Sequence, residues 1–296
     1  MKAVDVGTRI QLKNILYATD FSPTANAAAP YAAELTKHYG AKLYALHVQP
    51  PVNPMTPPES WKGLEEAAEI EAGRARRKIL DTLPEIHPEV LINGGDLWLN
   101  VADAIKENDI DLIVVGTHGR SGVSKFLLGS AAEEIFRQAP CPVLTIGPHS
   151  VTELKRSGVF TRILFATDFS SQSTSAASYA ISLAQEYQAR LTLLHVLTEP
   201  KTGDLVQPSD LEASSRQLLR HLVPPEAELW CVPDYVLEVG AVAERILDVA
   251  AERATDLIVL GVRQTHGFLG AATHLPMATA HKIVSRANCP VLTVRG

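Results

Sequence analysis

The sequence predicts an α/β protein of two similar domains, each with a five-stranded parallel sheet and helices on both faces. Residues 15–48 align without a gap with residues 163–196, at an offset of 148 positions. Within each half, short apolar runs typical of buried strands alternate with longer segments of helical periodicity. This alternation favours parallel strands joined by crossover helices. We place the two domains at residues 1–148 and 160–296.

The first half shows clear start and stop signals for its elements. Ser22 is a suitable helix cap, Pro23 suits the first helical position, and Gly40 is placed to end that helix. A Pro-rich loop is expected over 49–58. Apolar runs predict strands at 14–19, 42–48, 89–93, 111–115 and 142–146, and helices are expected over about 59–82 and 97–108 and from Ser130 onward.

The second half repeats this order. Its strands are expected at 162–167, 190–196, 234–239, 256–260 and 290–294. Parallel sheets of this kind bind ligands at the carboxyl ends of their strands, near the point where the strand order switches. We therefore expect functional residues just after the first and fourth strands of a half.

Composition excludes several classes of protein. The chain has 296 residues, a net charge of −6, 46% hydrophobic and 20% charged residues, as in soluble globular proteins. It has no basic block, so we expect no nucleic-acid partner. It shows no signal-peptide pattern and no long apolar span, so we expect a cytoplasmic protein without a membrane segment. Cys141 and Cys289 occupy equivalent positions before apolar runs, which favours buried thiols over a metal site or disulfides.

The strongest chemical signal is a glycine pattern after the fourth strand of the first half. Gly116 and Gly119 are followed, after nine intervening residues, by Gly129 and Ser130. Glycines allow a sharp turn and a close approach, and a helix N-terminus favours an anion. The pattern therefore indicates a phosphate site. The alternative is a plain loop with a capping box formed by Ser130 and Glu133, and both roles are compatible.

Other charged residues nearby are less specific. The chain lacks a Walker-type GK[ST] sequence, and Arg120 and Lys125 are interpreted first as solvated loop charges. Asp20 ends the first strand and Asp168 repeats it in the second half. A carboxylate at this edge could accept hydrogen bonds from ribose hydroxyls or help to hold a metal ion, or it could brace the following helix. Spacing alone leaves both readings open.

The positions of several further residues indicate structural roles. His47 and His195 occupy equivalent places near the ends of second strands, where a histidine is usually a hydrogen-bonded core residue. Asp96 is placed to cap a helix, and its counterpart is Ala241. No nucleophile with a matching base and no Cys/His metal spacing emerges. The sequence therefore points to a binding site rather than to a catalyst, and no catalytic or metal-binding residue is assigned.

These motifs make the chain resemble a tandem member of the universal stress protein family. The resemblance rests on ATDFS in both halves (18–22 and 166–170), on the glycine pattern, and on CPVLT before each last strand. It implies that each domain has a five-stranded parallel sheet of Rossmann-like, or flavodoxin-like, form. In this family the intact glycine pattern marks members that bind ATP, with or without Mg²⁺.

The resemblance also implies which residues would form the site. Asp20 would lie near the ribose, and Ala18, Thr19 and Val48 would line the base. The residues expected to contact or to lie beneath the phosphates are Gly116, Thr117, His118, Gly119, Gly129, Ser130, Ala131 and Ala132.

The second half departs from this pattern. Gly261 matches Gly116, but Gln264 stands in place of Gly119, and the gap-adjusted partners of Gly129 and Ser130 are Met277 and Ala278. A side chain at a glycine position would occupy the space of a phosphate. We therefore expect one ATP site, in residues 1–148, and weak or no ATP binding in residues 160–296, although a different loop built on Gly267 and Gly270 remains an alternative.

The resemblance further implies that the last strands of the two halves, 142–146 and 290–294, pair within the chain about a pseudo-two-fold axis. A homodimer of such chains is an open alternative. The expected function is that of an ATP-binding regulatory protein in stress response. A slow ATP hydrolase or nucleotidyl transferase using the same cleft, and an interaction module without nucleotide, are the alternatives.

Overall fold

The fold is given by a computed structural model of the chain. The structure describes residues 9–51, 57, 61–117, 128–147, 160–198, 208–225, 232–262 and 274–295. Most expected elements appear within one or two residues of the predicted bounds.

The first half alternates strands and helices as predicted. Ser22 caps α1, accepting a hydrogen bond from the Ala25 N–H at 3.2 Å, and Gly40 ends the helix with φ of 61°, a left-handed conformation that glycine adopts at no steric cost. The elements are β1 (Asn14–Ala18), α1 (Pro23–Tyr39), β2 (Lys42–Gln49), α2 (Trp61–Thr82), β3 (Glu89–Gly94), α3 (Leu97–Glu107), β4 (Leu112–Gly116), α4 (Ser130–Gln138) and β5 (Val143–Ile146).

The second half repeats the same succession. Ser170 caps α5, just as Ser22 caps α1. The elements are β6 (Arg162–Ala166), α5 (Ser171–Glu186), β7 (Arg190–Leu197), α6 (Pro208–Leu222), β8 (Asp234–Val239), α7 (Val242–Glu252), β9 (Leu257–Val262), α8 (His274–Arg286) and β10 (Val291–Arg295).

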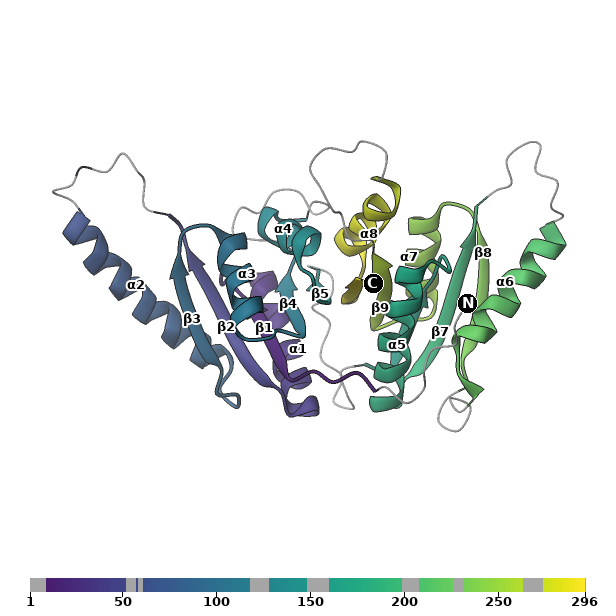
Figure 1. The fold of residues 1–296 in the computed structure, drawn as a ribbon, viewed down its shortest axis with the longest axis horizontal. Helices are drawn as coiled ribbons and strands as arrows, with labels where there is room; N and C mark the ends of the chain where they lie inside the picture. Colours follow the sequence, from purple (N-terminus) through teal and green to yellow (C-terminus); the bar gives the residue numbers. More distant parts are fainter. Residues whose placement is uncertain are drawn as a thin grey trace.

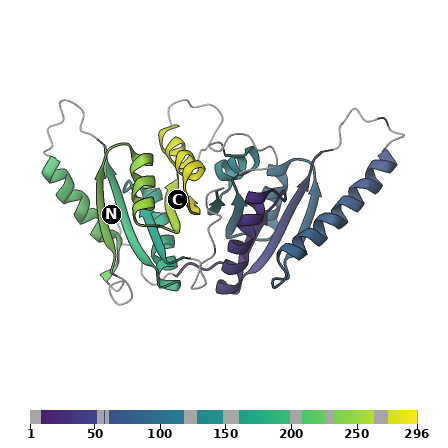
Figure 2. The same cartoon turned by 180° about the vertical axis from the view of Figure 1, so that it is seen from behind.

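All ten strands form one sheet in the order β3-β2-β1-β4-β5-β10-β9-β6-β7-β8. Every neighbouring pair is parallel except β5 and β10, which join the halves in antiparallel fashion. Leu144 faces Leu292 there, and these two residues are 148 positions apart. The pseudo-two-fold axis thus passes through this pair, and the expected pairing of the last strands is observed. Figure 1 shows the two halves side by side, with α2 and α6 at the outer ends, and Figure 2 shows the other side.

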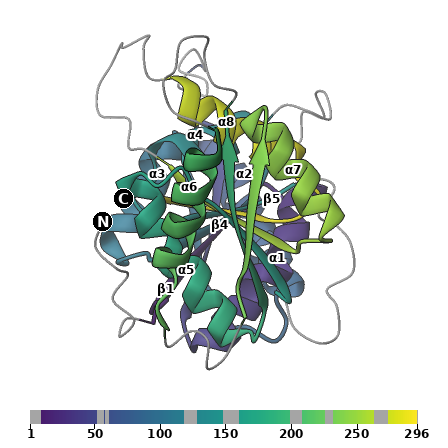
Figure 3. The same ribbon diagram turned by 90° about the vertical axis from the view of Figure 1, so that its right-hand side faces the viewer.

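Helices cover both faces of the sheet, as Figure 3 shows from the β8 end. One core cluster combines sheet residues with α1, α2, α5 and α6, and the other combines them with α3, α4, α7 and α8. Strands with both faces covered are apolar along their whole length, which accounts for the uninterrupted apolar runs in the sequence.

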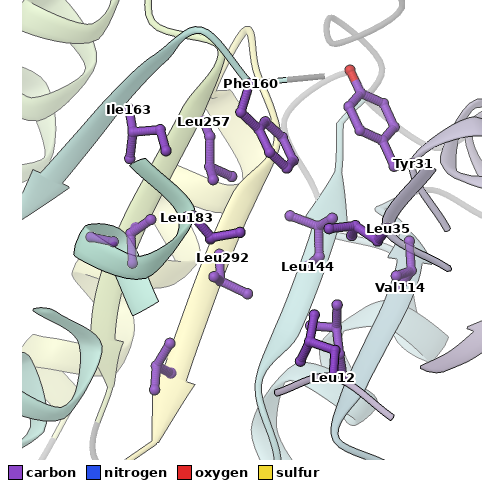
Figure 4. Close-up of a cluster of buried hydrophobic side chains, with 14 of the residues drawn as sticks. Leu12, Tyr31, Leu35, Val114, Leu144, Phe160, Ile163, Leu183, Leu257 and Leu292 are labelled. Carbon is purple, nitrogen blue, oxygen red and sulfur yellow. The ribbon is translucent and has the colours of Figure 1, made fainter. Parts of the chain in front are cut away.

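The junction between the halves is apolar at its centre. Figure 4 shows Leu144, Leu35 and Leu12 of the first half opposite Leu292, Leu183 and Phe160 of the second. The two buried threonines of the joining strands are hydrogen-bonded across it: Thr145 Oγ1 donates to the Val291 carbonyl at 3.0 Å, and Thr293 Oγ1 to the Val143 carbonyl at 3.3 Å. These side chains make the two halves one continuous core.

Candidate functional site

The carboxyl ends of β1 and β4 lie side by side in the middle of the first half. Ala18 of β1 pairs with Val115 of β4 and with Leu46 of β2. The order 3-2-1-4-5 switches direction between β1 and β4, which is where ligands of open α/β sheets bind. The structure therefore brings Ala18, at the end of β1, next to the end of β4 at Val115 and Gly116.

A tight turn follows β1. The Phe21 N–H donates to Thr19 Oγ1 at 3.1 Å, and the Ser22 N–H donates to Asp20 Oδ1 at 2.9 Å. Phe21 has φ of 63°, which is unusual for a bulky residue and marks a strained turn. His47 Nδ1 donates to the Thr19 carbonyl at 2.8 Å, since a carbonyl can only accept. His47 is buried, as expected of a hydrogen-bonded core histidine.

The turn after β6 repeats this arrangement. The Phe169 N–H donates to Thr167 Oγ1 at 3.0 Å and the Ser170 N–H to Asp168 Oδ1 at 3.0 Å, while Phe169 has φ of 60°. His195 Nδ1 donates to the Thr167 carbonyl at 2.8 Å. Burial lowers the pKa of His195 despite this hydrogen bond and the nearby Asp168 carboxylate. Thr19 and Asp20 therefore have a structural role that does not depend on a ligand.

In the second half, the first turn of α5 provides a further hydrogen bond to the carboxylate. Asp168 Oδ1 also accepts a hydrogen bond from Ser173 Oγ at 2.6 Å. Burial tends to raise the pKa of Asp168, but the hydrogen bonds from Ser170 and Ser173 outweigh it and hold the pKa below its usual value. The residue equivalent to Ser173 is Ala25, which has no hydroxyl group. The gapless repeat contains this difference, but our sequence analysis did not single it out.

Gly116 and Gly261 are required by packing within the protein. A Cβ at Gly116 would lie 2.5 Å from the Ala25 nitrogen and 2.6 Å from the Thr24 carbonyl oxygen. A Cβ at Gly261 would lie 2.6 Å from the carbonyl group of Gln172. In both halves the backbone of the first helix crosses close to the end of the fourth strand. We predicted that Gly116 allows the close approach of a ligand, but the close approach seen here is that of α1, and a glycine is needed for the same reason at Gly261 next to α5.

The start of α4 lies next to the end of β4. The Gly129 N–H donates to the carbonyl of Thr117, a fully buried residue, and the Glu133 N–H donates to the Gly129 carbonyl at 2.8 Å. The N–H groups of Ser130, Ala131 and Ala132 have no carbonyl partner within the helix, because no turn precedes them. The cap residue is Gly129, which has no side chain to accept from them.

The predicted capping box is wrong. It requires Ser130 at the cap position and Glu133 three residues later, whereas Ser130 is the first helical residue and Gly129 is the cap. By contrast, Asp96 caps α3 as predicted, accepting from the Leu99 N–H at 2.9 Å, and its counterpart Ala241 provides no such hydrogen bond to α7.

The remaining predicted residues are placed as follows. Val48 is half-buried near the end of β2, and packs against the cluster that contains α3 and α4. Ser130 and Ala131 are exposed, and Ala132 is buried. His118 and Gly119 lie outside the described residues, as do Arg120, Lys125, Gln264, Gly267 and Gly270.

The second half has a different backbone at the place of Gly129 and Ser130. There α8 already begins at His274, so Met277 and Ala278 lie inside the helix rather than at its start. The sequence alignment that pairs them with Gly129 and Ser130 therefore does not pair equivalent positions of a helix N-terminus.

The other groups with reactive side chains have ordinary structural surroundings. Burial raises the pKa of both Cys141 and Cys289 to about 12, so both thiols stay protonated. Within the ranges that the structure describes, no cluster of three or more His, Cys, Asp or Glu side chains could hold a metal ion. No helix in that part of the chain is both long and apolar enough to cross a membrane.

Comparison with known proteins identifies the family. A sequence model of the universal stress protein family matches residues 11–147 and again residues 160–295. The chain belongs to the universal stress protein family, as a tandem member. A universal stress protein of Mycolicibacterium smegmatis is similar over both halves, with 26% identity across 95% of this chain and 96% of its own length.

Single-domain relatives match one half at a time. The universal stress protein MJ0531 of Methanocaldococcus jannaschii is 34% identical over 45% of this chain and 81% of its own length. Among solved structures, a universal stress protein of Archaeoglobus fulgidus superposes with a TM-score of 0.69, covering 97% of this chain and 99% of its own, at 21% identity. The tandem Rossmann-like arrangement is thus shared with a universal stress protein of known structure.

Proposed function

We propose that the first half of this universal stress protein binds ATP, with or without Mg²⁺, and that the chain acts as an ATP-binding regulatory module in stress response. The observation that carries the proposal is the start of α4 at the switch point. Ser130 and Ala131 are exposed at this helix start, beside the ends of β1 and β4, and the cap residue Gly129 has no side chain to accept from the N–H groups of the first turn. Such a helix end favours a phosphate through its N–H groups and its dipole.

The rest of the nucleotide would extend along the same edge. Asp20 would face the ribose, and Ala18, Thr19 and Val48 would lie by the base. The sequence places Thr117, His118 and Gly119 on the path from Gly116 to the start of α4. In the second half Asp168 accepts a hydrogen bond from Ser173, and α8 begins at His274, so that Met277 and Ala278 lie within the helix. These differences support a single site in residues 1–148.

A change of charge at the start of α4 tests the proposal. In Ala131→Asp, an exposed carboxylate enters the first turn, where it complements the helix dipole but repels phosphate. We expect at least a tenfold loss of ATP affinity in equilibrium binding with labelled nucleotide, without loss of thermal stability. The matched control is Ala131→Asn, which has nearly the same shape without the charge and should bind within about threefold of the original chain.

Unchanged ATP affinity in the Ala131→Asp variant would contradict the assignment of the phosphates to α4. Mass spectrometry of the purified chain adds an independent test, since a bound nucleotide that co-purifies can be identified directly.

A further inference from the structure

The strongest unassigned feature is a charged contact at the pseudo-two-fold axis between the halves. His38 lies at the end of α1 and Glu186 at the end of α5, and they are equivalent positions, 148 residues apart. His38 Nε2 lies 3.5 Å from Glu186 Oε2, and their side chains are only 25% and 22% exposed. Two residues that are equivalent in the repeat thus contact each other, as Leu144 and Leu292 do on the sheet.

Aromatic rings surround this contact. The His38 ring stacks on Tyr187 with centroids 4.3 Å apart, and it meets Tyr39 edge-on at 5.1 Å. Burial, reinforced by the Glu186 charge, raises the pKa of Tyr39, so its hydroxyl stays neutral. Burial also raises the pKa of Tyr187, with contributions from Tyr39, Glu34 and Glu186. Little water reaches the Glu186 carboxylate, which makes its charge interactions stronger than on an open surface.

Arg9 adds a positively charged group from the first half. Its Nε lies 3.4 Å from Glu186 Oε1, on a segment whose Ile10 N–H donates to Ser182 Oγ of α5 at 3.0 Å. Figure 1 shows this N-terminal segment running from β1 across to α5. Basic groups at the axis therefore come from the first half, and the carboxylate that they meet comes from the second.

The apolar part of the junction, unlike the charged contact, has similar side chains in the two halves. It is built of equivalent pairs, such as Leu35 with Leu183 and Leu144 with Leu292, which would fit a second copy of the same half almost as well. Two second halves would instead bring Glu186 against Glu186, and two first halves would bring His38 against His38. Two carboxylates repel each other in a partly buried contact, and two imidazoles leave the axis without a carboxylate, so both pairings of like halves are less favourable there.

We propose that the contact of Glu186 with His38 and Arg9 makes pairing of unlike halves more favourable than pairing of like halves. The two copies have thus diverged at one axial position from a self-complementary surface into two complementary ones. The apolar pairs form the centre of the junction, and the axial charges determine which half is the partner.

Three variants of the full chain reproduce the alternative pairings at the axis. His38→Glu places two carboxylates there, as two second halves would, and Glu186→His places two imidazoles there, as two first halves would. The double variant His38→Glu with Glu186→His restores an unlike pair in reversed order. Denaturant unfolding compares all four chains at low salt.

We expect the equilibrium constant for unfolding to rise about tenfold in His38→Glu and by less in Glu186→His, because only the former creates a like-charge pair. The double variant should return to within about threefold of the original chain. Salt should reduce the penalty of His38→Glu. The matched control is Lys37→Glu, which reverses the neighbouring charge on the same helix but faces Glu85 of its own half, and should change the constant by about twofold or less.

Additive losses in the double variant would overturn the proposal, because they would show that shape rather than charge complementarity is measured. If His38→Glu alone does not accumulate as folded protein, recovery of folded chain on adding Glu186→His supports the proposal, and failure to recover it counts against it.

Discussion

The turns after β1 and β6 are nearly identical, whereas the amino-acid sequence that leads into α4 differs from the sequence that leads into α8. Both turns have a threonine, an aspartate and a phenylalanine with positive φ, held by the same hydrogen bonds. The cap residue of α4 is Gly129, whereas α8 begins at His274, which follows Thr273 in the sequence. The comparison distinguishes residues that stabilise the fold in both halves from residues that occur only in the first half and that the proposed ATP site uses.

Residues that have the same internal contacts in both halves are weaker evidence for ATP binding than residues found in the first half alone. Asp20 and Gly116 belong to the proposed nucleotide site, yet both have counterparts in the second half with the same internal contacts. Neither residue by itself indicates ATP. The residues particular to the first half are Gly119, Gly129 and Ser130, together with Ala25 in place of Ser173.

The largest predicted effect on stability is at the glycines near the ends of β4 and β9, Gly116 and Gly261. It tests whether both positions need a glycine for the same packing reason. We expect Gly116→Ala and Gly261→Ala each to destabilise the chain by about 3 kcal/mol, because the added methyl group overlaps helix backbone that cannot move aside easily. Thermal unfolding of both variants measures this. A loss at Gly116 with none at Gly261 would show that the two positions are not equivalent.

Asp111 and Asp256 are equivalent residues that should contribute unequally to the stability of the fold. Asp111 accepts hydrogen bonds from the N–H groups of Lys13 and Asn14, whereas Asp256 accepts from the Thr161 N–H, the Thr161 hydroxyl and the Arg162 N–H. Replacement by alanine should therefore cost about 2 kcal/mol at Asp256 and about 1 kcal/mol at Asp111. Chemical denaturation provides the measurement, and the reverse order would contradict the account.

The equivalent cap positions of α3 and α7 hold different residues, Asp96 and Ala241, and each can be replaced by the other type. Asp96→Ala should destabilise α3 by about 1 kcal/mol, because it removes the acceptor for the Leu99 N–H. Ala241→Asp should stabilise α7 by up to about 1 kcal/mol, since Ala241 already has the extended backbone of a cap residue. Unfolding midpoints that move in the same direction in both variants would refute this reasoning.

The smallest effect concerns acid sensitivity. The pKa of Asp168 is lowered in the folded chain, so its contribution to stability is present above the unfolded-state value of about 3.8 and is lost as pH falls through the lower folded-state pKa. Ser173→Ala removes one of the hydrogen bonds that lower it, and should reduce this contribution. The difference in stability between Ser173→Ala and the original chain should shrink below about pH 4, as unfolding measured across pH can show.

Much of the fold follows from the sequence because its signals are local. Ser22 with Pro23 and the continuous apolar strands specify helix starts and buried strands, and the repeat confirms each assignment independently. The cap of α4 was predicted one residue too late, because Ser130 is a better cap by residue type than Gly129. The hydrogen bond from Gly129 to Thr117, which a local pattern cannot show, sets the start of the helix.

The site was less accessible to sequence reasoning. Spacing could not show that α1 fills the space beside Gly116, since residues 24 and 116 are brought together only by the fold. The significance of Ser173 likewise depends on its 2.6 Å contact with Asp168, which no periodicity indicates. The positions of His38 and Glu186 at the axis required the pairing of β5 with β10.

Calorimetric titration of the full chain with ATP tests the central claim most directly. The account predicts about one ATP per chain, with binding lost when Gly119→Gln gives the first half the residue that stands at position 264. Two ATP molecules per chain, or a single site that Gly119→Gln leaves unchanged, would contradict the conclusion that only the first half has kept the nucleotide site.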